Sequence, residues 1–182
     1  MNPIPTQIIG TGLIGTSIAL RIAELGWPVE LIDNSTGALQ IATDLVPSAK
    51  KIDHPELVII ATTPKSLSSA AIAALQANPL ATVIDVGSVK NKVQVEVERF
   101  PDLSKRFVGT HPIAGRESSG PSASRSDLFL GRAWILTPSN QVEAERVNLV
   151  KAFISEMGAA PYEMSTKLHD AFFAKISHCR SY

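Results

Sequence analysis

The sequence has little of several features that would each define a class of protein. Its single cysteine, Cys179, allows neither an internal disulfide nor a cysteine-based metal cluster, so no metal site is expected. Lys and Arg number 17, as do Asp and Glu, so there is no basic excess for nucleic acid. No apolar run approaches membrane-spanning length, and the N-terminus lacks the pattern of a signal peptide. We therefore expect a cytoplasmic protein that binds neither nucleic acid nor membranes.

Short apolar segments alternate with amphipathic ones along the chain. The apolar, β-branched segments predict strands at residues 6–9, 29–32, 57–61, 82–86, 107–108, 133–136 and 161–164. Helices are expected at residues 13–25, 38–45, 66–76, 91–99 and 141–156, and in the terminal stretch KLHDAFFAKISH. This alternation predicts an α/β fold with a Rossmann-type doubly wound, mostly parallel sheet. The Ser-rich stretch SSGPSASRSD has the composition of a flexible loop.

The stretch IIGTGLIGTS joins the first predicted strand to the first helix and suggests a dinucleotide site. Gly10 allows a tight turn, Gly12 lets a pyrophosphate approach the backbone, and Gly15 lets the helix pack against the strand. Leu13 and Ile14, in the same turn, are predicted to border the cofactor. The alternative is a glycine-rich turn without a ligand, but the strand-to-helix context favours the dinucleotide.

Asp33 ends the second predicted strand and bears on the choice of cofactor. A carboxylate there accepts hydrogen bonds from a ribose 2′-hydroxyl and repels a 2′-phosphate, and the following Asn34, Ser35 and Thr36 include no arginine to hold that phosphate. The sequence therefore favours NAD over NADP. A helix N-cap or turn role for Asp33 is the alternative.

Further polar loops follow the next two strands, at the edge of the sheet where such folds bind ligands. Thr62, Thr63 and Pro64 follow the strand LVIIA and are predicted to contact the cofactor. Ser88 and Lys90 follow the strand VIDV, where they are either functional or simply a helix cap and a solvated lysine. On spacing alone, the two readings are equally good.

His111 follows the strand after that, in the stretch FVGTHPIAGRESSG. The proline after it disfavours helical geometry, and the glycines around it permit an unusual backbone path. An imidazole titrates near neutrality and can accept or donate a proton there. From the sequence alone, a catalytic and a structural histidine are both open.

Several stretches occur in a characteristic order and spacing over nearly the whole chain: GTGLIGTS, DVGSVK, GTHPIAGRE, LF followed by WILTP, and HDAFFAKISH. In these stretches the chain resembles the prephenate and arogenate dehydrogenases of tyrosine biosynthesis. GTHPIAGRE together with HD…ISH is far more specific than the glycine pattern. A related dehydrogenase or imine reductase on the same fold is disfavoured by GTHPIAGRE.

The resemblance implies an NAD-dependent oxidative decarboxylation of prephenate or arogenate, with the preference between them left open. His111 matches the histidine that takes the proton of the ring 4-hydroxyl. Ser88 matches the serine that orients this hydroxyl and the histidine. Residues expected near the substrate are Glu117, at the mouth of its pocket, and His169, Asp170 and His178, in the motif that opens the second domain.

The resemblance also implies two domains: a dinucleotide-binding domain over residues 1–164 and the start of a helical domain over residues 165–182. The family continues beyond ISH in a helical domain that forms a homodimer; here Cys179 to Tyr182 replace the usual Leu-Pro-His, and a truncated second domain is expected. The terminal helix would then expose Leu168, Phe172 and Ile176, favouring self-association or fraying. A catalytically silent NAD-binding remnant is therefore the alternative to an active enzyme.

Overall fold

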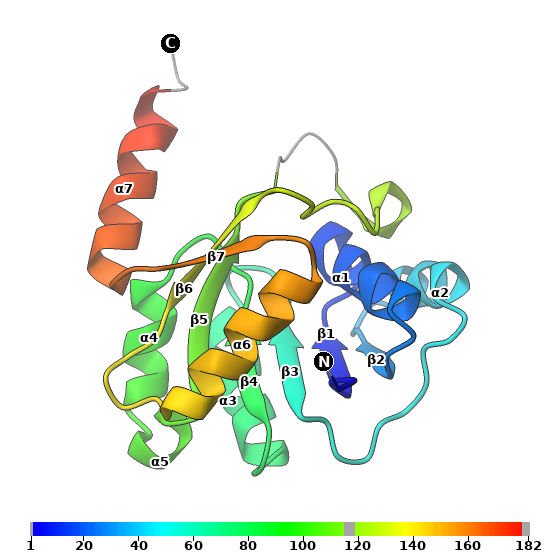
Figure 1. The fold of residues 1–182 in the computed structure, drawn as a ribbon, viewed down its shortest axis with the longest axis horizontal. Helices are drawn as coiled ribbons and strands as arrows, with labels where there is room; N and C mark the ends of the chain where they lie inside the picture. Colours follow the sequence, from blue (N-terminus) through cyan, green and yellow to red (C-terminus); the bar gives the residue numbers. More distant parts are fainter. Residues whose placement is uncertain (1, 115–118, 180–182) are drawn as a thin grey trace.

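The computed structural model describes residues 2–114 and 119–179. Its centre is a seven-stranded sheet in the order β2-β1-β3-β4-β5-β6-β7, in which β6 runs antiparallel to β5 and the other neighbouring strands are parallel (Figure 1). The strands are β1 (Thr6–Ile9), β2 (Val29–Ile32), β3 (Leu57–Ile60), β4 (Thr82–Asp85), β5 (Phe107–Pro112), β6 (Ala133–Thr137) and β7 (Ala160–Glu163). The predicted doubly wound, mostly parallel α/β fold is confirmed.

Helices cover both faces of this sheet because its central strands are apolar on both sides. The helices are α1 (Leu13–Glu24), α2 (Thr36–Leu45), α3 (Leu67–Ala77), α4 (Asn91–Glu98), α5 (Pro101–Ser104), the 3-10 helix η1 (Pro121–Ala123), α6 (Ala144–Glu156) and α7 (Thr166–Cys179). Ile8 and Ile59 pack with the apolar side chains of α1 and α6. Val58 and Ile60, one residue out of phase, pack with those of α3 and α4.

Two elements differ from the sequence prediction in a way that matters for the site. β5 does not end at Val108 but continues to Pro112, since β6 returns antiparallel beside it and pairs His111 with Ile135. His111 therefore lies within a strand rather than in a loop. Helix α6 begins at Ala144, three residues later than expected.

The described part of the Ser-rich stretch is anchored to α1. The Ser124 hydroxyl donates to the Leu13 carbonyl at 3.2 Å, and the Arg125 N–H donates to the Ser17 hydroxyl at 3.1 Å. Helix η1, just before them, contacts both α1 and α2. This part of the chain is consequently held over the start of α1 rather than left as a free loop.

Helix α7 stands at the margin of the molecule, with its first turn beside α4 and its far end projecting away (Figure 1). Leu168, Phe172 and Ile176 are exposed along it, as the sequence predicted, whereas Phe173 faces the body of the protein. None of the helices in the described part of the chain has both the length and the apolar character needed to cross a bilayer.

Candidate active site

The carboxyl ends of the parallel strands bring the predicted polar residues to one edge of the sheet. The glycine turn follows β1, Thr62 to Pro64 follow β3, and Ser88 follows β4. His111 is the second-to-last residue of β5, the strand next to β4 in the sheet. Ligands in such sheets bind at this edge, so the arrangement has the layout of a cofactor and substrate crevice.

Two glycines of the first turn are required by the packing of the chain itself. Gly10 has φ +105°, and a Cβ on it would lie 2.4 Å from the Ala61 carbonyl oxygen. A Cβ on Gly15 would lie 2.0 Å from the Gly10 carbonyl oxygen. Both contacts are far too short. A side chain at Gly10 would push the turn away from the end of β3, and a side chain at Gly15 would push α1 away from the turn.

Gly12 differs from these two because nothing in the described chain lies within 4 Å of a Cβ built on it. It is the N-cap of α1, and among the residues that the structure describes no side-chain hydrogen bond caps this helix. Open space beside an uncapped helix N-terminus is what a pyrophosphate needs. The turn therefore fits a dinucleotide.

Asp33 lies beside the same turn and is held there by hydrogen bonds. Its carboxylate accepts from the Thr11 N–H at 2.7 Å, the Thr11 hydroxyl at 2.8 Å and the Ser35 N–H at 2.7 Å. Burial alone would raise the pKa of Asp33, but these bonds outweigh it and lower that pKa. The carboxylate thus stays charged at neutral pH. Its bonds to Thr11 and Ser35 also show that Asp33 stabilises the local turns, the alternative role that the sequence left open.

The remaining predicted cofactor residues border this turn. Leu13 and Ile14 are half-buried in the first turn of α1, and Thr63 and Pro64 are exposed after β3. Within the described residues, the hydroxyl oxygen of Thr62 is buried and has no hydrogen-bond partner. The Thr62 backbone nitrogen lies 2.9 Å from the position of a Gly10 Cβ, so this orphaned hydroxyl belongs to the wall of the glycine turn.

His111 meets the first turns of α7. Its Nδ1 lies 2.9 Å from Nε2 of His169, and the two ring centroids are 5.1 Å apart. Phe173, one turn further along α7, packs edge-on against His111 at 4.9 Å and beside His169 at 4.6 Å. His111 is half-buried, whereas His169 is fully buried.

Asp170 connects this cluster to α4. Its carboxylate accepts from the Lys90 N–H at 3.0 Å and the Asn91 N–H at 2.9 Å, so it caps the N-terminus of α4 from a different helix. His169 Nδ1 lies 2.7 Å from the same carboxylate. Burial would raise the pKa of Asp170, but these three hydrogen bonds lower it. Asp170 is accordingly a charged acceptor.

Beneath the cap lies a buried ion pair that the sequence analysis did not identify. The Lys90 ammonium bonds the Asp85 carboxylate and donates to the Thr110 carbonyl at 2.6 Å, with both charged side chains fully buried. Burial raises the pKa of Asp85 and lowers that of Lys90, each opposed by their mutual attraction. The reading of Lys90 as a solvated lysine is therefore wrong. The signal was Asp85 itself, a carboxylate inside the apolar strand TVIDV.

Comparison with known proteins identifies this architecture. A sequence model described as the nucleotide-binding domain of prephenate dehydrogenase matches residues 26–163. The chain belongs to the prephenate dehydrogenase family. Among its curated relatives, a probable prephenate dehydrogenase, NovF, of Streptomyces niveus is 36% identical over 92% of this chain and 47% of its own length. The prephenate dehydrogenase of Bacillus subtilis is 32% identical over 98% of this chain and 52% of its own length.

Solved structures agree with this assignment. The prephenate dehydrogenase of Aquifex aeolicus, solved with hydroxyphenyl propionate and NAD⁺, has a TM-score of 0.85 at 30% identity, over 95% of this chain and 64% of that one. The arogenate dehydrogenase of Synechocystis shares the fold, with a TM-score of 0.86 at 24% identity, over 96% of this chain and 64% of that one. The chain spans about half the length of the first two curated relatives.

For three further residues predicted from the prephenate dehydrogenase resemblance, the structure shows the position only in part or not at all. Ser88 is half-buried in the turn after β4, at the same edge as His111. The hydrogen bond described for His111 joins it to His169 rather than to Ser88. Glu117 lies outside the described residues, and for His178 only the backbone, in α7, is described. Their predicted roles stay predictions.

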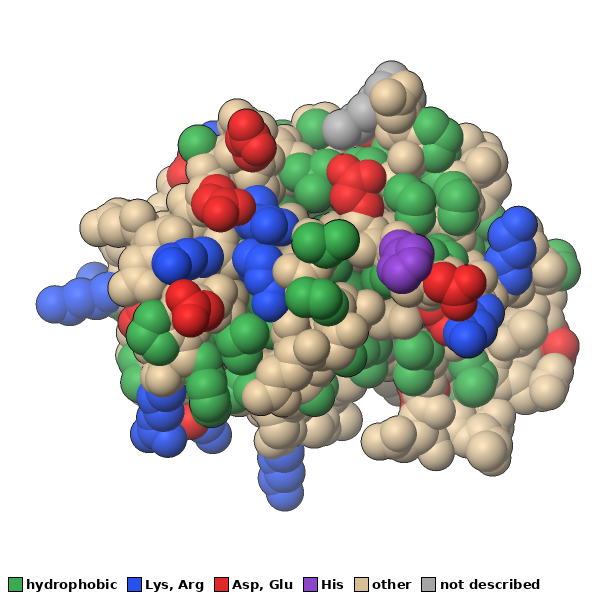
Figure 2. Space-filling view, turned by 90° about the horizontal axis from the view of Figure 1, so that it is seen from below, with side chains coloured by type: hydrophobic (Ala, Val, Ile, Leu, Met, Phe, Trp, Pro, Cys, Tyr) green, Lys and Arg blue, Asp and Glu red, His purple; other side chains and the backbone are tan. Residues whose placement is uncertain are grey.

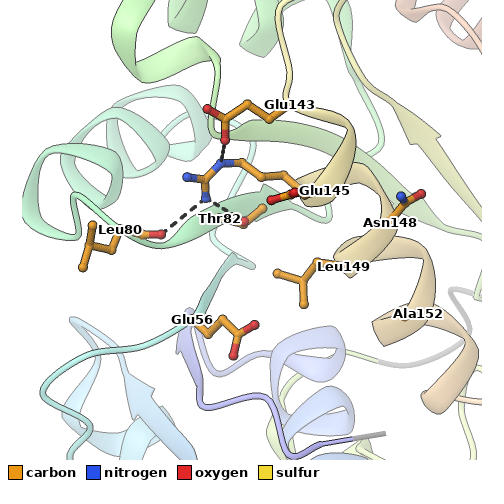
Figure 3. A pocket seen from close by; sticks show the side chains of 9 residues that line it. Glu56, Leu80, Thr82, Glu143, Glu145, Asn148, Leu149 and Ala152 are labelled. Atoms are coloured by element: carbon orange, nitrogen blue, oxygen red, sulfur yellow. Dashed lines mark hydrogen bonds and ion pairs between the residues drawn. The ribbon is translucent and has the colours of Figure 1, made fainter.

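The opposite edge of the sheet carries a hollow of about 460 Å³ between the starts of β3 and β4 and helix α6 (Figure 3). Arg146 lines it, but its guanidinium is already bonded to Glu143 at 2.7 Å, to the Thr82 hydroxyl at 3.1 Å and to the Leu80 carbonyl at 3.3 Å. The face seen from this side mixes acidic, basic and apolar side chains without a patch of one sign (Figure 2). Because the guanidinium of its basic residue, Arg146, is bonded within the protein, and because the hollow lies at the edge opposite the carboxyl ends of the strands, it is a poor candidate for the active site.

Proposed function

We propose that the chain binds NAD at the glycine turn and acts in the oxidative decarboxylation of prephenate, arogenate or both in tyrosine biosynthesis. One observation carries this proposal: a half-buried histidine, His111, ends β5 at the same sheet edge as the open space beside Gly12. A proton acceptor and a dinucleotide cradle at one edge are the two parts that such a reaction requires.

The residues around the first turn would hold the dinucleotide. The uncapped N–H groups at the start of α1 would bind the pyrophosphate, with Gly12 leaving room for it. The charged Asp33 would accept from the ribose hydroxyls and repel a 2′-phosphate, which favours NAD over NADP. Leu13, Ile14 and the loop from Thr62 to Pro64 would form the walls of this site.

The proposed chemistry needs one proton acceptor from the protein. When bound, NAD supplies the acceptor for the hydride that leaves the hydroxyl-bearing ring carbon. His111 accepts the hydroxyl proton, so the O–H bond breaks and an N–H bond forms on the imidazole. The carbon–carbon bond to the carboxylate breaks, its electrons aromatise the ring and carbon dioxide departs. The phenolate oxygen then takes the proton back from the His111 imidazolium, which returns the base to its neutral form. Ser88 is proposed to orient the hydroxyl, and Glu117 and His178 are proposed to lie near the substrate.

The test is NADH formation by the purified chain, followed at 340 nm with NAD or NADP and with prephenate or arogenate. We expect turnover with NAD, and a loss of roughly 10²- to 10⁴-fold in His111→Asn, the range for removal of a general base. NAD affinity, measured by calorimetry, should change less than about twofold in this variant, because His111 lies near the end of β5 and not in the glycine turn. Turnover that survives in His111→Asn would remove this residue from the mechanism.

A chain that binds NAD but turns over neither substrate would instead fit the second candidate, a silent NAD-binding remnant. The observation that favours this candidate is that the chain spans about half the length of its curated relatives. Under either candidate, we propose that residues 1–164 form the nucleotide-binding domain and that the segment from residue 165 opens a helical domain, in which the family homodimer would form.

A further inference from the structure

A continuous series of hydrogen bonds runs from the start of α4 to the proposed base. The Lys90 and Asn91 N–H groups donate to Asp170, Asp170 bonds His169 Nδ1, and His169 Nε2 bonds His111 Nδ1. The distances between bonded atoms lie between 2.7 and 3.0 Å. The series joins three elements, α4, α7 and β5, that are far apart in the sequence.

Which atom donates in each hydrogen bond of this series follows from the backbone N–H groups and the carboxylate at its start. Backbone N–H groups can only donate, and a carboxylate can only accept, so the Asp170 carboxylate is the acceptor at both ends. His169 must then donate from Nδ1. A neutral His169 has its lone pair on Nε2, so the proton between the two rings belongs to His111 Nδ1.

His169 is neutral because it is fully buried. Burial lowers its pKa, although the neighbouring Asp170 opposes this shift. If His169 were an imidazolium, Nε2 would donate and the proton order would reverse. Its ring packs against His111 and Phe173, at centroid distances of 5.1 and 4.6 Å, and it is 0% exposed, so water does not solvate a charge on it.

We propose that Asp170 and His169 are positioning residues that hold His111 in the Nδ1–H tautomer, so that Nε2 is the nitrogen that accepts the substrate proton. This inference rests on the proposed function for its catalytic meaning, but the tautomer itself is a property of the chain. Under this inference His169 and Asp170, which the sequence predicts near the substrate, act there through His111, since a fully buried His169 and a helix-capping Asp170 have protein partners.

The same series stabilises the charge that His111 acquires. When Nε2 accepts a proton, His111 becomes an imidazolium whose Nδ1–H already points at the lone pair of His169. His169 in turn donates to the Asp170 carboxylate, so the positive charge faces a chain of dipoles that ends on a negative group. No second proton transfer is needed, because each ring keeps the proton it holds at rest.

The direct test is the tautomer of His111 in the unmodified chain, read from the ¹⁵N chemical shifts of its ring at about pH 8, above the ordinary histidine pKa. The chain has four histidines, so His54→Gln and His111→Asn spectra assign the signals. We expect a protonated Nδ1 and an unprotonated Nε2. A protonated Nε2 in the unmodified chain would overturn the inference, whatever the activity.

The second test is Asp170→Asn, which preserves size and can still cap α4 through its amide oxygen. An amide can donate as well as accept, so it no longer fixes the direction of the series. We expect His111 to shift toward the Nε2–H form and, in an active preparation, kcat to fall by roughly 10²-fold with KM for NAD nearly unchanged. Asp102→Asn, an exposed aspartate on α5, is the matched control. An unchanged tautomer in Asp170→Asn would contradict the assignment.

His169→Phe provides an independent variant, because it keeps an aromatic ring beside His111 but removes the acceptor. Without that acceptor, His111 should no longer be held in the Nδ1–H tautomer. The two proposals can fail separately. Turnover with a protonated Nε2 on His111 would end the positioning inference alone, whereas the expected tautomer without turnover would leave it standing and count against the proposed enzyme activity.

Discussion

Each end of the sheet carries a basic side chain bonded to a carboxylate, and the two pairs differ in burial and in surroundings. At the carboxyl edge, Lys90 and Asp85 have fully buried side chains, and the Lys90 ammonium also donates to the Thr110 carbonyl. At the amino edge, the side chains of Arg146 and Glu143 are 21% and 58% exposed, beside an open hollow. Water can replace the partner of an exposed charge but not that of a buried one. A charged pair alone therefore says little about function, whereas one buried under a hydrogen-bonded histidine cluster indicates a built site.

The strongest test of this difference removes one charge from each pair. Lys90→Met leaves Asp85 buried without its partner and should lower the free energy of unfolding by about 3–5 kcal/mol. Glu143→Gln at the exposed pair should lower it by less than about 1 kcal/mol. Urea unfolding followed by the fluorescence of the two buried tryptophans, Trp27 and Trp134, measures both. Equal losses would erase the distinction drawn between the two edges.

A smaller effect separates two glycines within the carboxyl edge. Gly15→Ala places a Cβ 2.0 Å from the Gly10 carbonyl oxygen, and should cost about 1–3 kcal/mol of stability together with NAD binding. Gly12→Ala meets no atom of the described chain within 4 Å, so stability should change by less than about 0.5 kcal/mol. Only its NAD affinity, measured by calorimetry, should fall. A stability loss in Gly12→Ala as large as in Gly15→Ala would show that the space beside Gly12 is not open.

The smallest effect is a dependence of stability on pH that comes from His169. Burial holds its pKa in the folded chain below the ordinary value of about 6.5. As the pH falls below about 6.5, the unfolded chain therefore takes up a proton that the folded chain does not, and stability is lost with a slope of at most about 1.4 kcal/mol per pH unit. The lowered pKa values of Asp33 and Asp170 act at more acidic pH.

His169→Phe should flatten this profile between about pH 6.5 and 5, while His54→Gln, at an exposed position near the amino edge, should leave it unchanged. Urea midpoints across this range measure the effect. A profile that steepens in His169→Phe would mean that the folded protein carries His169 as an imidazolium, which would also reverse the proton order in the histidine cluster.

Local features of the chain were predictable because their physical causes are local. The strands follow from runs such as LVII, and the turn after β1 follows from Gly10, whose positive φ disfavours other residues. The length of β5 was not predictable, because it depends on the antiparallel return of β6. The burial of Lys90 was missed for the same reason: its partners Asp85 and Thr110 become neighbours only when β4 and β5 pair. Likewise, nothing in the spacing of His111 and His169 indicates that their rings meet.

The contrast among the glycines of the first turn also concerns inheritance. Gly10 and Gly15 are demanded by folding, so a descendant that had lost its cofactor would still retain them. Gly12 is demanded by no atom of the described chain and would be free to drift once nothing had to approach it. Across related sequences, the first and third glycines thus record ancestry, and the second records whether selection for the nucleotide continues. The presence of Gly12 in this chain therefore fits continued nucleotide binding, which an active enzyme and a silent NAD-binding remnant share.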